Sequence, residues 1–248
     1  MRERTQELQN ASQELRELST RILQAQDEER RRIARELHDG AGQLLAALGM
    51  EAYNLAQESD RLSSRAASSL TNIESLVKQM TKDIRTMSHL LYPPLLDEVG
   101  LRSALTDYVK GFSERSGIEV SLDLPAAIER LDRDYEVSFF RIVQECLTNI
   151  HRHSGSKTAS IRVVSDEGAL VLEVRDEGRG MPAERLSEIQ SKGSGVGIRG
   201  MRERVLQFSG TMSIESGDSG TRIRVVIPTP TTAPRARTSS DEPLQTAV

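Results

Sequence analysis

The chain has 248 residues, of which 37% are hydrophobic and 28% charged, and this composition indicates a globular protein with a substantial core. Its net charge of -4 and its 3% aromatic content argue against nucleic acid held by overall charge or by base stacking. The single cysteine, Cys146, excludes an internal disulfide framework and a multi-cysteine zinc site. No apolar run approaches the ~20 residues that span a bilayer and no signal peptide opens the chain, so we expect a cytoplasmic protein or the cytoplasmic part of a larger one.

The first 92 residues contain no proline and repeat apolar residues at heptad spacing, which predicts long helices that supercoil in pairs. One series runs through Leu8, Leu15, Ile22, Ala11, Leu18 and Ala25, and a second through Ala34, Ala41, Leu48, Leu55, Leu37 and Leu44. The eleven-residue step from Ile22 to Ile33 predicts a stutter between the two series. A second amphipathic helix is predicted over 70–91, after a turn near 59–65. Two such antiparallel hairpins would make a four-helix bundle.

After Pro93 and Pro94 the pattern changes to alternating strands and helices. The predicted strands are 118–124, 158–164, 169–175, 211–214 and 221–227, and the predicted helices are 134–152, 182–190 and 198–209. This order is typical of an α/β sandwich. The segment 229–248 is rich in Pro, Thr, Ser and Arg and is predicted to be a disordered tail.

A histidine in the first helix is the first candidate for chemistry. In the heptad numbering His38 lies beside the apolar seam, where an imidazole nitrogen reaches solvent. Asp39 could hold one ring nitrogen as N–H and leave the other as a nucleophile, and Gln43 could orient a water. Gly40 and Gly42 would let a bulky partner approach. The alternative is an ordinary surface histidine on a charged helix.

A polar stripe on the 134–152 helix is the second candidate. Glu145, Asn149, Arg152 and His153 recur at helical spacing, so they share one face. Carboxylate and amide oxygens beside cations suit Mg²⁺ and phosphates. A solvated helix face is the alternative.

Two glycine-rich segments complete the candidate site. Asp176 follows a predicted strand and could accept a hydrogen bond from an exocyclic amine, while Gly178 and Gly180 permit close approach, although a plain turn has the same composition. Farther along, the helix N-terminus at Gly193, Gly195 and Gly197 could bind phosphate through its N–H groups. The spacing is neither that of a P-loop nor that of a Rossmann fingerprint.

The stretch Glu29-Arg-Arg-Arg-Ile-Ala-Arg-Glu-Leu-His-Asp-Gly-Ala-Gly-Gln43 resembles the H box of two-component sensor histidine kinases, in the subfamily that partners NarL/LuxR-type response regulators. The segment 83–105 is similar to that subfamily's second bundle helix and linker. The resemblance implies that His38 accepts phosphate, that Asp39 acts as base and that Gln43 supports dephosphorylation of the partner. The basic run 30–32 is either a solvated face or a surface that meets phosphates or an acidic receiver domain.

The stretch Gln144-Glu-Cys-Leu-Thr-Asn-Ile-His-Arg-His-Ser154 resembles the N box of the Bergerat ATP-binding fold. The resemblance implies that Asn149, with Glu145, holds Mg²⁺, and that Asp176 binds adenine. It implies further that 193–197 is the second glycine box and that Thr221 joins the adenine pocket. Residues 181–192 would be a short, mobile ATP lid, and no clear F box is present.

The expected architecture is an antiparallel helical hairpin forming a dimeric four-helix bundle, followed by an α/β sandwich ATP-binding domain of the Bergerat type. The expected domains are a signalling coiled coil (1–26), a dimerisation and histidine phosphotransfer domain (27–96), a catalytic ATP-binding domain (97–228) and the tail (229–248). The expected cofactors are ATP and Mg²⁺. The expected partners are a second copy of the chain and a response regulator receiver domain. No direct binding of nucleic acid is expected, and contact with a membrane is expected only through a sensor region outside this chain.

The expected activity is autophosphorylation of His38 from ATP, transfer to an aspartate of the response regulator, and phosphatase activity toward that regulator. Two alternatives stay open. A serine kinase of the anti-sigma type would use the same ATP fold but needs no H box, and a coiled-coil scaffold would bind nucleotide without transferring phosphate.

Overall fold

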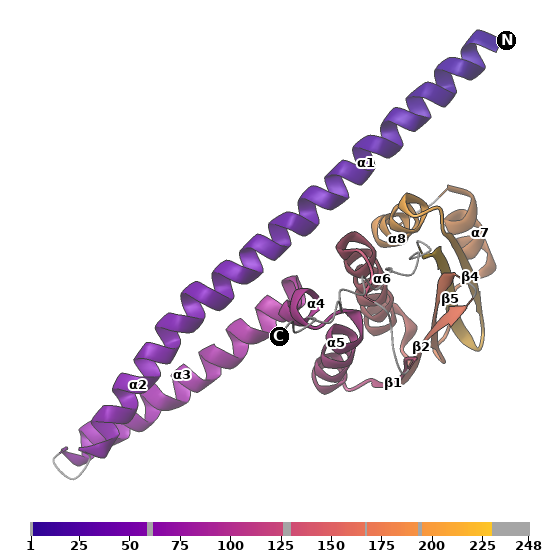
Figure 1. Ribbon diagram of the computed structural model, residues 1–248. Helices are drawn as coiled ribbons and strands as arrows, with labels where there is room; N and C mark the ends of the chain where they lie inside the picture. The colour runs from indigo at the N-terminus through magenta and orange to yellow at the C-terminus, as the bar shows by residue number, and fades with distance from the viewer. Residues whose placement is uncertain (1, 59–61, 126–129, 167, 193–194, 230–248) are drawn as a thin grey trace, which may run out of the picture.

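The computed structural model describes residues 2–58, 62–125, 130–166, 168–192 and 195–229. A long helical rod leads into an α/β domain, and helices α6 (Arg133–Asn149) and α8 (Val196–Gln207) of that domain face the rod (Figure 1). None of the helices in this described part of the chain is long and apolar enough to cross a membrane.

The rod is one nearly continuous helix that is met by an antiparallel partner. Helix α1 (Arg2–Glu36) passes through a π-helical turn, η1 (Leu37–Ala41), into α2 (Gly42–Gln57), and α3 (Ser64–Leu91) returns alongside (Figure 1). Ser63 caps α3, because its side chain accepts a hydrogen bond from Ala66 N–H. The hairpin that the heptad pattern predicts is therefore present.

The hairpin buries only part of the predicted seam. Buried apolar side chains along it are Ala34, Leu45, Ala52, Leu70 and Val77. By contrast Leu44, Leu48 and Leu55 keep 74%, 48% and 51% of their surface exposed. One apolar face of the rod thus packs within the chain, and another stays open.

Two helices join the rod to the sheet domain, and the sequence patterns did not indicate them. Helix α4 (Pro94–Glu98) begins at a proline, and α5 (Leu101–Ser116) ends at Gly117, whose φ of 68° is the left-handed conformation that favours glycine. Helix α4 is tied to neighbouring elements by Asp97, whose carboxylate accepts hydrogen bonds from Arg31 Nε at 2.7 Å and from Tyr92 at 2.8 Å. The linker is therefore fixed to α1.

The sheet has five strands in the order β1-β2-β3-β5-β4. The strands are β1 (Glu119–Asp123), β2 (Thr158–Asp166), β3 (Ala169–Asp176), β4 (Thr211–Gly217) and β5 (Gly220–Pro228). Only β1 and β2 pair in parallel, and the other neighbours are antiparallel. All five lie where the alternating pattern predicts strands.

Helices α6 (Arg133–Asn149), α7 (Ala183–Lys192) and α8 (Val196–Gln207) complete the domain, and α6 ends in a second π-helical turn, η3 (Ile150–Ser154). The core forms between these helices and the sheet, and Phe139, Phe140 and Leu172 are at most 1% exposed. This arrangement confirms the expected fold class of a helical region followed by an α/β sandwich.

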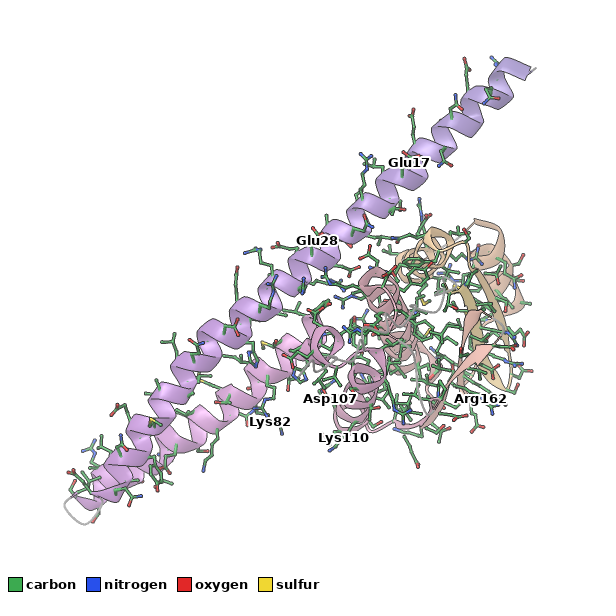
Figure 2. The ribbon with its side chains drawn as sticks, viewed as in Figure 1. Glu17, Glu28, Lys82, Asp107, Lys110 and Arg162 are labelled. Atoms are coloured by element: carbon green, nitrogen blue, oxygen red, sulfur yellow. The ribbon has the colours of Figure 1, made fainter. Side chains whose placement is uncertain are left out.

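A buried carboxylate is one of the contacts between the α/β domain and the rod; Arg141 and Gln144 of α6 also donate to the Leu91 and Leu90 carbonyls of α3, each at 2.8 Å. Asp27 of α1 accepts hydrogen bonds from Arg141 Nε of α6 at 2.8 Å and from Arg204 Nη1 of α8 at 2.5 Å. All three side chains are at most 10% exposed. Figure 2 marks this stretch of α1 by Glu28, where the helix passes the domain.

In the basic run Arg30 and Arg32 are exposed, and Arg32 pairs with Glu29 and Glu36 of its own helix, as on a solvated face, whereas Arg31 pairs with Asp97 of α4. The segment expected as a lid contains the ten-residue helix α7. Residues 230–248 of the predicted tail lie outside the described residues, whereas Thr229 donates its N–H to the Gly168 carbonyl at 2.7 Å.

Candidate functional site

The candidate histidine lies in the π-helical turn between α1 and α2. The side chain of His38 is 60% exposed, and its Nδ1 lies 3.1 Å from Asp39 Oδ1. Since a carboxylate only accepts, this contact places the ring proton on Nδ1 and leaves the lone pair on Nε2. A side chain added at Gly40 would meet nothing within 4 Å, so the surface two residues after His38 is open. Sequence reasoning missed the π turn, a feature that is frequent at functional sites.

A cavity of about 420 Å³ opens in the α/β domain between α6, α7, α8 and the sheet. Nine of the predicted nucleotide-site residues line it: Glu145, Asn149, Arg152, His153, Asp176, Gly180, Gly195, Gly197 and Thr221. The fold therefore brings the polar stripe of α6 and the two glycine segments to one place.

One wall of this cavity carries oxygen ligands and cations. Asn149 donates from Nδ2 to Glu145 Oε1 at 3.3 Å, which leaves the amide oxygen of Asn149 as an acceptor. Amide and carboxylate oxygens are the hard donors that Mg²⁺ prefers, so this pair fits the ion. Among the described residues, no group of three or more His, Cys, Asp or Glu gathers as a metal centre of its own. The N-terminus of α8 lies against Glu145, and the approach is so close that a Cβ on Gly197 would collide with that side chain.

The opposite wall combines one buried carboxylate with apolar side chains. Asp176 is 4% exposed, and its Oδ1 accepts the Gly178 N–H at 2.8 Å. The apolar lining of the cavity includes Val174, Met181, Ile189, Ile198, Ile214 and Ile223. A flat, apolar ring with one edge of hydrogen-bond donors would fit this wall.

The glycines of the Asp176 segment are required by close backbone approach. Gly178 does not line the cavity but supports Asp176, and a Cβ there would collide with the carbonyl of Ser154. Gly180 has a φ of +63°, and a Cβ there would collide with the backbone of Gly217.

Not every predicted residue can be placed, and some lining residues were missed. Gly193 lies outside the described residues. Arg185 and Ile189 of α7 line the cavity, although only the apolar spacing of 182–190 hinted that this helix has an inner face. Cys146 lines it too, but its side chain is 1% exposed and burial raises the pKa of the thiol, so it is a packing residue.

Comparison with known proteins agrees with both halves of this geometry. The family model described as "Histidine kinase" matches residues 29–96, and the model described as "Histidine kinase-, DNA gyrase B-, and HSP90-like ATPase" matches residues 134–231. The chain belongs to the histidine kinase family. The expected family and the ATP-binding fold are thereby confirmed. The first match contains His38, and the second contains the whole lining of the cavity.

A curated relative supports this membership, and a solved structure shares the fold. "Sensor histidine kinase MctS" of Rhizobium johnstonii is 34% identical over 219 residues, which are 88% of this chain and 47% of the relative. The chain thus spans about half the length of this curated histidine kinase. The histidine kinase domain of the Erythrobacter litoralis EL346 blue-light activated histidine kinase has a TM-score of 0.50 at 18% identity, covering 75% of this chain and 94% of that one. The longer blue-light activated histidine kinase of the same organism has a TM-score of 0.48 at 19% identity, covering 75% and 59%.

Proposed function

We propose that this chain is the catalytic part of a two-component sensor that phosphorylates its own His38 from ATP and passes the phosphate to an aspartate of a response regulator. The observation that carries the proposal is a combination within one chain. An exposed imidazole is paired with a carboxylate on a helical rod, and an open cavity with a buried carboxylate and glycine-bordered walls lies in the attached ATPase-type domain.

Different residues of the cavity bind different parts of the nucleotide. Asp176 accepts a hydrogen bond from the exocyclic amine of adenine, and the apolar walls cover the ring. The phosphates extend toward the N-terminus of α8 and toward Arg152 and His153, where N–H groups and cations meet their charge. Glu145 and Asn149 would hold Mg²⁺, which when bound neutralises charge on the phosphates.

The contact between His38 and Asp39 sets up the nucleophile. Nε2 attacks the γ-phosphorus in line, an N–P bond forms, the bond to the β–γ bridging oxygen breaks and ADP leaves. Asp39 keeps the proton on Nδ1 and offsets the positive charge that develops on the ring. In the reverse role, Gln43, which is exposed on the next turn, positions water against the aspartyl phosphate of the regulator.

Phosphate transfer requires the α/β domain to move along the rod. The domain contacts α1 at Asp27, eleven residues before His38, which corresponds to roughly 16 Å of helix rise. The polar interface at this point favours such motion, since small, polar interfaces between domains seldom fix them rigidly.

A second copy of the chain is the proposed partner for the open face of the rod. Exposed apolar side chains lie on both helices of the hairpin, and they include Leu44, Leu48, Leu55, Ile73, Leu76 and Met80. Large apolar side chains exposed repeatedly along both helices are typical of an interface. Packing two hairpins would bury them in a four-helix bundle. The remaining proposals are a receiver domain of the NarL/LuxR type as phosphate acceptor, and a cytoplasmic location with a membrane reached only through a sensor region.

The test is labelling with ATP that carries an isotope on the γ-phosphate. Wild type should become labelled in an acid-labile, alkali-stable form, and His38→Gln should lose the label. His89→Gln is a matched control, because His89 is a partly exposed histidine on α3 that pairs with Asp107 at 3.0 Å. Labelling retained in His38→Gln would refute the acceptor. An acid-stable label would favour the serine kinase, and normal nucleotide binding without any label would favour the scaffold.

A further inference from the structure

The hydroxyl of Ser216 joins three chain segments behind the wall of the nucleotide cavity. Ser216 lies on β4 opposite Thr221 of β5. Its Oγ accepts a hydrogen bond from the Met181 N–H at 2.9 Å, and it lies 2.8 Å from Thr221 Oγ1 and 3.3 Å from the Gly220 carbonyl oxygen. Met181 and Thr221 line the cavity. Any effect of Ser216 on a ligand in the cavity would therefore pass through these two neighbours.

The three distances decide where the hydroxyl protons go. Ser216 has one O–H proton, and the normal range for an O–H···O hydrogen bond is about 2.5–3.0 Å. The 2.8 Å contact with Thr221 is within this range, and the 3.3 Å contact with the Gly220 carbonyl is outside it. If Thr221 donated to Ser216, the Ser216 proton would have only the long contact to Gly220. The network is satisfied when Ser216 donates to Thr221, and the Thr221 proton is then available to a ligand.

Thr221 and Asp176 stand next to each other on paired strands. The β3–β5 register pairs Arg175 with Arg222, and a Cβ on Gly220 would collide with the Asp176 backbone. The wall thus offers a carboxylate acceptor beside a hydroxyl donor. Adenine presents an amine donor beside the N1 acceptor, which matches this pattern. Guanine presents a carbonyl acceptor beside an N1–H donor, which mismatches it at both positions.

We propose that Ser216 is a specificity-determining positioning residue, which holds the Thr221 hydroxyl as a donor beside Asp176 and so selects adenine over guanine nucleotides. The inference rests on the proposed function, because it assigns a role within the same nucleotide site. It adds a residue that does not itself line the cavity and that neither glycine segment contains.

The test compares the dissociation constants of ATP and GTP by calorimetry, with Mg²⁺ present, for wild type, Ser216→Ala and Ser216→Thr. Ser216→Ala releases the Thr221 hydroxyl to act as donor or acceptor. Its ATP:GTP preference should fall by about threefold to tenfold, the range expected for one neutral hydrogen bond. Ser216→Thr keeps the hydroxyl and should retain the wild-type ATP:GTP preference. Ser213→Ala, at an exposed serine on the same strand, is the matched control and should leave the preference unchanged.

A purely structural role for Ser216 gives a different result. If the serine only stabilises the hairpin, Ser216→Ala weakens ATP and GTP equally, the ratio stays at the wild-type value, and the proposal is overturned. Should Ser216→Ala fail to fold, Ser216→Cys keeps the size and offers only a weak donor, so a wild-type ratio in that variant overturns the proposal equally well. Wild type that binds neither nucleotide would instead show that the proposed function itself is wrong.

Discussion

Replacing Asp27 by alanine tests how the α/β domain is held on the rod. The Asp27 carboxylate is shared by Arg141 at 2.8 Å and Arg204 at 2.5 Å, with side-chain exposures of 10%, 4% and 10%. Burial lowers the pKa of the Arg141 guanidinium, and the neighbouring Asp27 opposes that shift. Two buried cations therefore share one anion, and Arg141 also donates to Gln144 Oε1 and to the Leu91 carbonyl.

The magnitude follows from the charges that Asp27→Ala leaves behind. Removing one member of a buried ion pair typically costs about 3–5 kcal/mol, because the remaining charge is buried without a partner. Here two like charges remain. Most of the apolar core lies within the α/β domain, although it extends to Ala34 of α1 and Tyr92, and the interface beside the triad contains a polar cavity of about 160 Å³. Undocking from α1 restores water to both arginines without unfolding the domain, so we expect the domain to leave the rod.

The assay measures domain position and phosphate transfer separately. Small-angle scattering should show a larger radius of gyration for Asp27→Ala, while the urea midpoint of the α/β domain stays close to that of wild type. The initial rate of His38 labelling should rise, since the docked domain lies upstream of the histidine. Glu28→Gln removes an exposed carboxylate one residue away and should change neither measurement. Unchanged scattering and labelling in Asp27→Ala would refute the reasoning.

Two further predictions concern single carboxylates of the α/β domain. Asp176→Asn turns an acceptor into a donor opposite the adenine amine, so ATP binding measured by calorimetry should weaken by about 10- to 150-fold, equivalent to the ~1.5–3 kcal/mol of a charged hydrogen bond. The exposed Asp218→Asn is its control, and an ATP affinity within twofold of wild type in Asp176→Asn would contradict the assignment. Burial raises the pKa of Glu136 above its ordinary 4.5, although Arg130 opposes the shift. The protonated Glu136 side chain therefore makes its full contribution to the free energy of unfolding below pH 4.5, and this contribution is lost as pH rises through the higher pKa of the folded state. The urea midpoint of Glu136→Gln should rise relative to that of wild type from about pH 4.5 toward pH 7. A difference between the two midpoints that stays constant or falls over this range would contradict the raised pKa of Glu136.

The sequence predicted most elements because their signals are local. The alternation of apolar residues located all five strands, and helical spacing located α3, α6, α7 and α8. Helices α4 and α5 were missed, since the proline pair was interpreted as an end of the helical region and not as the start of a linker with structure of its own. The π turn at His38 was also missed, because two glycines inside a heptad pattern indicate only that the helix is weakened there.

The residues of the candidate site that lie in recognisable sequence motifs could be predicted. Glu145 and Asn149 share a helix face by spacing alone, and Asp176 follows a strand that alternation locates. Ile189 and Met181 of the wall were not predicted, because their place depends on how the 181–192 segment packs against the sheet. The sequence also could not decide what the basic run contacts, since the partner of Arg31 is Asp97, sixty-six positions away.

The order of amino acids by itself determined the helical hairpin, the five-stranded domain and the chemical types that line its cavity, because each depends on spacing within a few residues. Only the tertiary structure decided which side chains meet across the chain. Asp27 meets Arg141 and Arg204 across 114 and 177 positions. Such contacts arise from the packing of whole helices and strands, which fixes distances that no local periodicity encodes.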